Sequence, residues 1–269
     1  MFRAVLIGAF FIIMTPLLIS IQWLLEKLHL PGWGFIACKY YRVLRALLRI
    51  HLRIEGASAR GRAVLFISNH VSWVDIVVIG SIAPVAFVAK SEVRRWPLVG
   101  ITARMQRTVF VERTRRRQAA QAVGDIVARL KTGTSVVLFA EGTSSDGNRV
   151  LPFRSALIGA VREAAAAGGD IAIQPMSIGY TGQHGIAMGR QYRPLVAWYG
   201  DLDFLPHMKS FIRNGVVDAV VSYGAPLAAD GAMDRKIMTR RLEETVRGLT
   251  AASLRGRPPP DLDRRPGPS

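Results

Sequence analysis

A histidine and an aspartate stand five positions apart in the segment SNHVSWVD, residues 68–75, between the apolar runs AVLFI and IVVIG. An imidazole can take a proton from a hydroxyl group near neutral pH, and a neighbouring carboxylate can hold the ring in one tautomer. His70 and Asp75 could therefore abstract a proton from a substrate alcohol. They could equally be part of an ordinary strand end, where Asn69, His70 and Ser72 serve as turn and cap residues.

The chemistry of this pair depends on the elements that hold it. On one continuous helix the two side chains would lie about 140° apart, on different faces. If a strand ends near His70 and a helix begins near Ser72, Asp75 can reach back to one ring nitrogen. The other nitrogen then faces outward, and a substrate alcohol can attack directly without a serine nucleophile on the protein.

Two further segments could contribute to a site. In the loop AEGTSSDGNR, residues 140–149, Gly142 allows a close approach of backbone amides to a ligand. Glu141 could bind substrate hydroxyls or a cation, or it could be structural. Arginines are dense between residues 94 and 117, and Arg113 ends the apolar run TVFVER, where it could grip a phosphate with two parallel hydrogen bonds. The run Arg115–Arg117 suits a solvated or lipid-facing helix start.

The elements around these segments alternate between strand and helix patterns. We expect an α/β fold, a single domain with a central mixed sheet flanked by helices, behind an N-terminal membrane-associated helical segment. Predicted strands cover residues 62–68, 85–90, 107–113, 134–142, 170–180 and 216–224, and predicted helices cover 115–131, 155–168 and 234–254.

The composition limits the possible partners. The chain has 269 residues, a formal net charge of +17 and one cysteine, Cys38. A lone cysteine excludes an intrachain disulfide framework. The positive charge favours an anionic membrane surface or nucleic acid. Nucleic acid is disfavoured, because the basic residues interleave with strand ends and an apolar segment instead of lining a reading helix.

The apolar segment runs from Ala4 to Leu25 without a charged residue, long enough to cross a bilayer as a helix. A signal peptide is the alternative, although no small-residue cleavage site follows. Pro16 predicts a kink or a re-entrant dip. The next residues, 38–53, place Arg42, Arg45 and Arg49 at helical spacing and predict a basic amphipathic helix on an anionic membrane, or one packed on the domain. The basic excess after the apolar run predicts a cytoplasmic domain.

The domain boundaries follow from these patterns. Membrane-anchoring helices are expected at residues 1–53 and the α/β domain at 54–252. Residues 253–269 are expected to form a disordered tail, because RPPPDLDRRPGPS is rich in proline and polar residues.

The order of five segments, NHVSWVD, KSEVRRWPLVG, VFVER, FAEGTSSDGNRVLPFR and IQPMSI, resembles the NHxxxxD glycerolipid acyltransferases, and above all the bacterial 1-acyl-glycerol-3-phosphate acyltransferases. The resemblance implies that His70 and Asp75 are the catalytic pair and that Arg113, Glu141, Gly142, Thr143 and Arg154 bind the acceptor. It also implies a lysolipid acceptor and acyl-CoA or acyl carrier protein as donor. The sequence has no HExxH or paired-cysteine motif, so no metal is expected, and no cofactor is expected either. The expected location is a bacterial inner membrane, with the domain on the cytoplasmic side.

Departures from the family pattern bear on the acceptor. Ser144 replaces the arginine of the usual FPEGTRS block, and Arg107 stands where the second block often has glycine. The first reading is acylation of 1-acyl-glycerol-3-phosphate to phosphatidic acid. The alternative is acylation of lyso-ornithine lipid, an amino-acid lipid without phosphate. A non-catalytic basic membrane adaptor is the alternative from another class.

Overall fold

The computed structural model describes residues 2–28, 32–96, 99–111, 116–155, 158, 171–227 and 234–258. Arg113, most of the helix predicted at residues 155–168 and the tail from residue 259 lie outside this set. The strands described are β1 (Ile50–Glu55), β2 (Ala63–Ser68), β3 (Val85–Lys90), β4 (Val109–Val111), β5 (Ser135–Phe139), β6 (Ile171–Gln183), β7 (Ile186–Ala187) and β8 (Val217–Tyr223).

These strands form one mixed sheet in the order β1-β8-β6-β2-β5-β3-β4, with the short β7 paired to β6. Neighbours along the order are parallel except for the antiparallel pair of β6 and β8. The carboxyl ends of β2, β5 and β3 therefore meet at one edge of the sheet, where ligand sites of open α/β sheets form. The predicted α/β fold with a central mixed sheet is confirmed.

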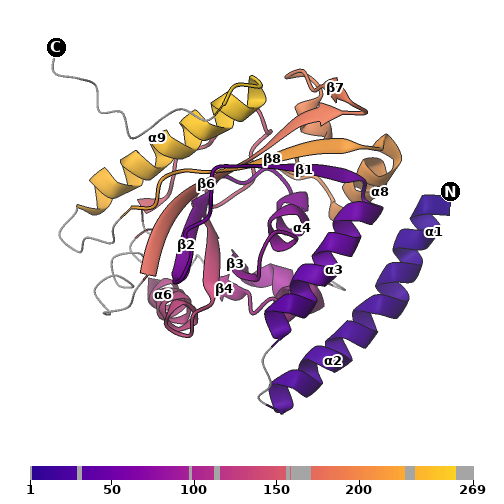
Figure 1. Ribbon diagram of the computed structural model, residues 1–269, viewed down its shortest axis with the longest axis horizontal. Helices are drawn as coiled ribbons and strands as arrows, with labels where there is room; N and C mark the ends of the chain where they lie inside the picture. Colours follow the sequence, from indigo (N-terminus) through magenta and orange to yellow (C-terminus); the bar gives the residue numbers. More distant parts are fainter. Residues whose placement is uncertain are drawn as a thin grey trace.

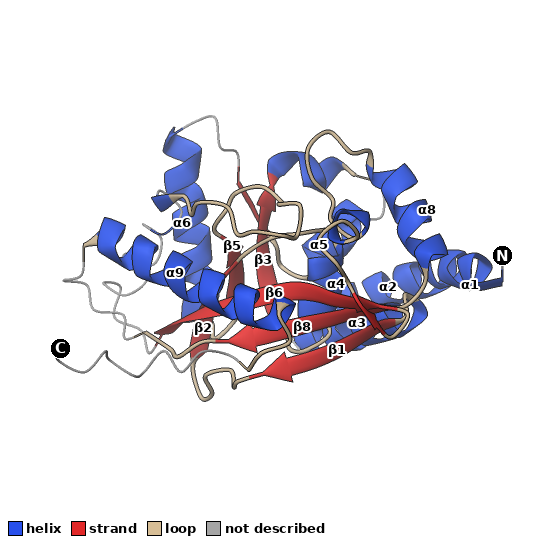
Figure 2. Cartoon of the chain, turned by 90° about the horizontal axis from the view of Figure 1, so that it is seen from above, coloured by secondary structure: helices blue, strands red, loops and turns tan. Residues whose placement is uncertain are grey.

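Helices cover both faces of the sheet (Figures 1 and 2). Along β2, Val64 and Phe66 face a core shared with α3 (Trp33–Leu47), α4 (Val74–Gly80) and α8 (Phe204–Asn214). The alternate residues Ala63, Leu65 and Ile67 face a second core with α6 (Arg116–Lys131) and α9 (Arg235–Leu254). This alternation is the period-2 pattern of a strand buried on both faces.

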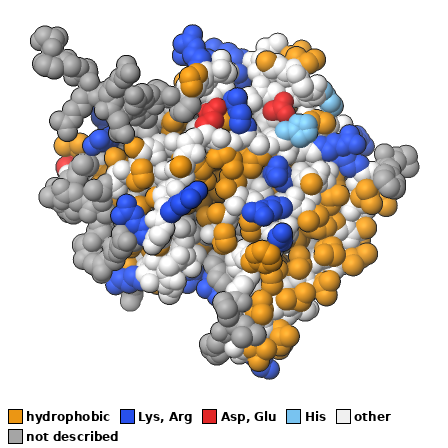
Figure 3. Space-filling view, viewed as in Figure 1, with side chains coloured by type: hydrophobic (Ala, Val, Ile, Leu, Met, Phe, Trp, Pro, Cys, Tyr) orange, Lys and Arg blue, Asp and Glu red, His pale blue; other side chains and the backbone are white. Residues whose placement is uncertain are grey.

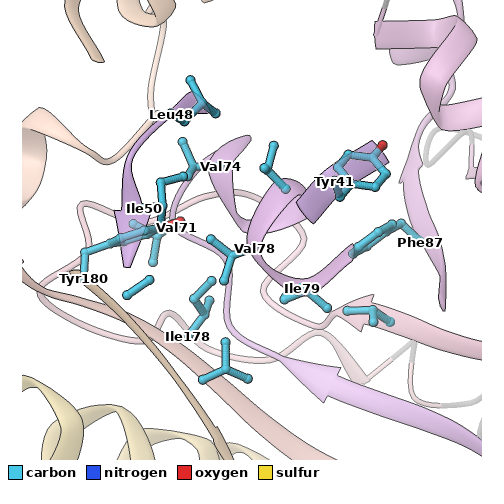
Figure 4. Packing of buried hydrophobic residues seen from close by; sticks show 14 of the residues in the cluster. Tyr41, Leu48, Ile50, Val71, Val74, Val78, Ile79, Phe87, Ile178 and Tyr180 are labelled. Atoms are coloured by element: carbon cyan, nitrogen blue, oxygen red, sulfur yellow. The ribbon is translucent and has the colours of Figure 1, made fainter. Parts of the chain in front are cut away.

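The first core holds the turn after β2 in place. Val74 and Val78 of α4 pack with Ile178 and Tyr180 of β6 in this cluster (Figure 4). All four side chains are at most 2% exposed. Close packing at this density leaves little room for the start of α4 to shift, so the residues just before it are held firmly against the sheet.

The segment predicted as one basic helix over residues 38–53 divides into two elements. The helix α3 ends at Leu47, Arg49 adopts a left-handed φ of 54°, and β1 begins at Ile50. The prediction of a helix over residues 50–53 is therefore wrong, and the expected boundary at residue 53 falls within a strand of the sheet. Arg42 donates from Nε to the carbonyl oxygen of Ser81 at 3.0 Å, which is a contact inside the protein.

The apolar N-terminal segment forms α1 (Phe2–Ala9), a π-helical turn (Phe10–Met14) and α2 (Thr15–Lys27). Pro16 was expected to kink this helix, and the wide turn lies directly before it. Proline lacks an N–H and clashes with the carbonyl of residue 12, so a π-helical turn relieves the clash without ending the helix. The remaining short helices are η2 (Ser91–Arg95), α5 (Val99–Met105) and η3 (Arg193–Leu195).

Figure 1 shows α1 and α2 running alongside α3 at the edge of the molecule. Polar contacts hold them there at three levels: Arg3 to the carbonyl of Leu48, Thr15 to Tyr40, and the buried Gln22 to the carbonyl of Met105. Among the described residues, Val5–Leu25 is the one helical stretch long and apolar enough to cross a membrane.

Candidate active site

The strand-turn-helix arrangement expected around His70 is present. The strand β2 ends at Ser68, α4 begins at Val74, and the imidazole Nδ1 of His70 lies 2.7 Å from Oδ2 of Asp75. An ionised carboxylate only accepts hydrogen bonds, so Nδ1 carries a proton and donates. Nε2 is then the ring nitrogen that can accept a proton from a substrate.

Asp75 is completely buried, and its carboxylate is held by several donors. Oδ2 also accepts from the backbone N–H groups of Val71 at 2.7 Å and Ser72 at 3.0 Å. Oδ1 accepts from the hydroxyl of Tyr180 at 2.7 Å. Burial raises the pKa of Tyr180 well above its ordinary value, and the charge of Asp75 adds to the effect. The phenol therefore remains a donor throughout the working pH range.

Asn69 fixes the end of β2 against β6. Its side-chain amide donates to the carbonyl of Ile178 at 2.9 Å and accepts from the N–H of the same residue at 2.9 Å. Asn69 is 1% exposed, so these bonds form in the protein interior, away from water. Hydrogen bonds are stronger there, and they fix the orientation of the Asn69 side chain. Because Asn69 is fixed, the backbone of the next residue, His70, is also held in place.

Replacement of Tyr180 by phenylalanine is expected to lower kcat about tenfold, because hydrogen bonds to charged groups contribute roughly 1.5–3 kcal/mol. The carboxylate would lose the donor on Oδ1 and hold the imidazole less firmly. KM for both substrates is expected to stay unchanged, since Tyr180 is buried away from solvent. Steady-state kinetics on Tyr180→Phe measures the two effects separately.

Tyr223→Phe is the matched control for this variant. Tyr223 is also a buried tyrosine of the same core, and its ring lies tilted against that of Phe66, with centroids 5.7 Å apart. The tyrosine hydroxyl bonded to Asp75 is that of Tyr180. Equal losses of kcat in Tyr180→Phe and Tyr223→Phe would show that general weakening of the core, and not the bond to Asp75, is responsible.

Glu141 lies behind His70 and faces the protein interior. It is 2% exposed, and its two oxygens accept from the backbone N–H groups of His70 at 3.0 Å and Leu151 at 3.1 Å. Burial raises the pKa of Glu141 to about 8, although these two bonds act in the opposite direction. The carboxyl group therefore adds little charge at neutral pH, and its contacts suit holding the loop against His70.

The other residues predicted to bind the acceptor differ in where the structure places them. Gly142 (φ +74°) and the exposed Thr143 line a cavity together with His70. Arg154 is exposed, and the described lining of that cavity does not include it. Arg113 lies outside the described residues, so its predicted contact with the acceptor stays a prediction.

The cavity around His70, called here the active-site cavity, has a volume of about 250 Å³. The imidazole is 20% exposed and stacks on Phe139, with ring centroids 4.1 Å apart. Lys90, Glu92 and Ser144 are among the polar residues that line the cavity. The ring thus opens onto a partly enclosed space and is supported from behind by an aromatic side chain.

A second space, called here the apolar cavity, continues from the first. Its volume is about 490 Å³, and it extends between α3, α4, α8 and the N-terminal helix. Six residues line both cavities: Tyr41, Trp73, Ile76, Trp96, Val99 and Thr102. The apolar lining suits a hydrocarbon chain.

Sequence reasoning did not identify Tyr180, Asn69 or the aromatic residues around Trp73 as part of the site. Tyr180 belongs to an apolar strand and reads as an ordinary core residue, so no local signal marks it. Asn69 stands next to His70, and its pairing with Ile178 depends on a contact across 109 positions. The described residues contain no group of three or more side chains placed to hold a metal ion.

Comparisons with known proteins place the chain in a family. Residues 49–179 match the family described as Acyltransferase. The chain is 44% identical to a lyso-ornithine lipid O-acyltransferase of Brucella abortus, over 96% of this chain and 98% of that protein. It is 28% identical to a 1-acyl-sn-glycerol-3-phosphate acyltransferase of Neisseria gonorrhoeae, over 77% of each.

A solved structure has the same fold. The crystal structure of the 1-acyl-sn-glycerophosphate acyltransferase PlsC from Thermotoga maritima superimposes with a TM-score of 0.68, covering 95% of this chain and 94% of that one at 20% identity. The strand order, the placement of His70 and Asp75 and the long match to Brucella abortus lead to one family assignment. The chain belongs to the PlsC-like acyltransferase family.

Proposed function

We propose that this protein transfers a fatty acyl group from a thioester donor to the free hydroxyl of a lysolipid. The observation that carries the proposal is the imidazole of His70, held at Nδ1 by a completely buried carboxylate and opening onto the active-site cavity. A paired imidazole of this kind suits removal of a hydroxyl proton, and no nucleophilic serine or cysteine is required.

The reaction balances with these groups alone. Nε2 of His70 takes the hydroxyl proton of the acceptor while the acceptor oxygen forms a bond to the thioester carbonyl carbon. The carbon–sulfur bond of the tetrahedral intermediate then breaks, and the leaving thiolate takes the proton from the imidazolium. The products are an ester and a free thiol. Asp75 stabilises the imidazolium while it carries the proton.

The acyl chain is assigned to the apolar cavity. Trp73 and Trp96 line both this space and the active-site cavity, so a chain bound there can keep its thioester near His70. Ile7 and Phe11 of the N-terminal helix also line this space. The anchoring helix thus also forms part of the proposed chain-binding wall.

The acceptor assigned here is lyso-ornithine lipid, the alternative of the sequence analysis, in preference to 1-acyl-glycerol-3-phosphate. The similarity to the Brucella abortus protein supports this choice over nearly the whole chain, and a second lyso-ornithine lipid O-acyltransferase, from Rhizobium meliloti, is 40% identical over 95% of this chain. Ser144 adds support, because its hydroxyl donates to the carbonyl of Trp198 instead of supplying a cation for a phosphate.

A comparison of the two acceptors, each given separately, tests the assignment. Purified full-length protein in mixed micelles is given labelled acyl-CoA with either lyso-ornithine lipid or lysophosphatidic acid. We expect kcat/KM to be at least about tenfold higher with lyso-ornithine lipid, the effect of one charged contact of about 1.4 kcal/mol. Thin-layer separation of the labelled products measures both rates.

A higher kcat/KM with lysophosphatidic acid would instead support the first function considered, the synthesis of phosphatidic acid. Transfer to neither lipid, from either acyl-CoA or acyl carrier protein, would favour the non-catalytic adaptor. Each outcome therefore selects one of the functions considered.

We also propose attachment to one face of the bacterial inner membrane, with the domain in the cytoplasm. Exposed apolar side chains of the N-terminal helix support it, among them Val5, Ile12 and Trp23, each at least 60% exposed. Figure 3 shows apolar side chains gathered over this side of the molecule. The polar contacts at Arg3 and Gln22 favour embedding alongside the domain over a crossing. Extraction by detergent but not by salt checks the attachment.

A further inference from the structure

A third pocket, distinct from the active-site cavity and the apolar cavity, is strongly basic. This arginine pocket has a volume of about 590 Å³ and lies between η2, α5, β4 and α6. Four arginines line it, Arg94, Arg104, Arg107 and Arg129, against one acidic residue, Asp125, among the described lining residues. Ser91, Thr108 and Gln121 add hydroxyl and amide groups. Such a lining suits a phosphorylated ligand.

The guanidinium groups are held in place by the fold. Arg129 donates from Nε to the carbonyl of Arg107 at 3.3 Å, and Arg104 donates from Nε to the carbonyl of Gly100 at 3.2 Å. Arg94 lies over the ring of Phe110, 6.0 Å from its centroid. Each of these two hydrogen bonds uses one of the five N–H donors of an arginine. The bond therefore orients the guanidinium group, and the other four donors take no part in it.

The backbone at Arg107 is strained. The helix α5 ends in a Schellman motif, with Thr108 N–H donating to Ala103 O at 3.1 Å and Arg107 N–H to Arg104 O at 2.9 Å. Arg107 occupies the left-handed position of this motif with φ 52°. Glycine is the favoured residue there, because a side chain strains the backbone. Arg49 and His184 adopt a similar left-handed φ of 54°, so the strain is not by itself a sign of function. At Arg107 it adds to the gathering of four arginines in one pocket.

The pocket adjoins the active-site cavity. Thr108 lines both spaces, and the segments 88–96 and 102–109 contribute side chains to each. From β2, which ends two residues before His70, to β4 there are three strand spacings, roughly 14 Å. A phosphopantetheine arm, the thiol-bearing arm of both coenzyme A and acyl carrier protein, has the contour of about four extended residues, roughly 15 Å. A phosphate in the pocket and a thioester at His70 are therefore compatible.

We propose that the arginine pocket binds the phosphate of the phosphopantetheine arm of the acyl donor. This inference rests on the proposed function, because it presumes a thioester donor. It gives the pocket a ligand class, a pantetheine phosphate, and gives Arg107 the role of a donor-binding residue. The acceptor lipid is bound elsewhere, in the active-site cavity.

The variant Arg107→Gly offers a sharp test because it relieves the strain. The full-length protein in detergent micelles is expected to show a Tm equal to or above that of the wild type. KM for acyl-CoA is expected to rise about tenfold, and binding of coenzyme A, measured by calorimetry without turnover, to weaken by about the same factor. KM for the acceptor should not change. Arg94→Ala should act in the same direction, and Arg60→Ala, an exposed arginine before β2, is the control.

Acyl-CoA and acyl carrier protein are compared as donors in the same variants. A rise in KM for both donors supports the pantetheine phosphate. A rise for acyl-CoA alone would assign the pocket to the nucleotide phosphates of coenzyme A and would overturn the proposal. A rise for acyl carrier protein alone would indicate contact with an acidic protein surface and would overturn the proposal.

The proposal and the proposed function can fail separately. Unchanged donor KM and unchanged coenzyme A binding in Arg107→Gly and Arg94→Ala, beside an active wild-type enzyme, would overturn the arginine pocket alone. A wild-type protein that transfers no acyl group and binds no coenzyme A would overturn both. An inactive wild type whose coenzyme A binding still weakens in Arg107→Gly would remove only the proposed transfer reaction.

Discussion

Replacement of His70 by alanine is expected to lower the rate of acyl transfer by about 1,000-fold, within the range that a positioned general base contributes. Without the imidazole, nothing at this position removes the proton of the acceptor hydroxyl as it attacks the thioester. The residual rate would come from bringing donor and acceptor together. Release of thiol from acyl-CoA, followed spectrophotometrically with saturating lysolipid, measures the loss.

The fold is expected to survive this change. His70 is one-fifth exposed at the edge of a cavity, so its removal opens no enclosed void. Membrane association should also be unchanged, because the apolar helix of residues 5–25 is separate from the turn that carries His70. A melting curve and a flotation assay with liposomes check these two expectations.

The protein offers a matched control for the His70 variant. His51 also pairs with an aspartate, with Nδ1 3.1 Å from Oδ1 of Asp218, but that pair lies on the surface and its histidine side chain is 71% exposed. His51→Ala should retain full activity. If His70→Ala retained more than about a tenth of the wild-type rate, the general-base role would be wrong, since a base contributes at least about 100-fold.

The central geometry of the site was predictable because it is local. His70 and Asp75 are close in sequence, and the change from strand to helix between them brings the side chains together. The apolar run before His70 and the one after Asp75 indicated this change. The exact partners of the carboxylate were not predictable. Tyr180 is 105 positions from Asp75, and only the pairing of β6 beside β2 brings its hydroxyl to Oδ1.

Two elements show where pattern reading failed. In β1 the residues Ile50, Leu52 and Ile54 alternate with polar ones, a strand signal that the helical spacing of the preceding arginines obscured. The helix α8 was not predicted, although Phe204, Met208 and Phe211 recur at helical spacing and Pro206 lies in its first turn, where proline is tolerated. Both signals were present in the sequence, and both were overlooked.

The arginine pocket could not have been located from the sequence. Arginine density between residues 94 and 117 was evident, but the pocket also needs Arg129 from the far part of α6. The one sequence sign of the left-handed backbone at Arg107 is that the similar acyltransferases often have glycine at this position. Charge density indicates an anionic partner in general, whereas the assembled fold defines which arginines meet and where they lie relative to His70.

Replacement of Asp75 by asparagine is expected to lower kcat about 100-fold, the loss of a charge-assisted hydrogen bond near the upper end of the usual range. Oδ2 of Asp75 accepts from three N–H groups, those of His70 Nδ1, Val71 and Ser72. The asparagine oxygen is expected to take this position, because an amide NH2 there would face three donors. The NH2 group would then face Tyr180, whose hydroxyl can turn and accept.

The tautomer of His70 and the fold are therefore expected to be preserved in Asp75→Asn, and the negative charge is what is lost. The imidazolium formed during the reaction would have no buried counter-charge, so kcat should fall while both KM values stay close to those of the wild type. Steady-state kinetics with each substrate varied in turn measures the split. Asp218→Asn, at the surface pair with His51, is the control and should leave kcat unchanged.

A double variant separates the charge from the geometry. Tyr180 acts through the carboxylate of Asp75, so Tyr180→Phe should cost much less in the Asp75→Asn background than in the wild type. Full additivity of the two losses would mean that Tyr180 supports the site by another route. Retention of half or more of the wild-type kcat in Asp75→Asn would mean that the imidazole works without its counter-charge, and the pair would then only orient the ring.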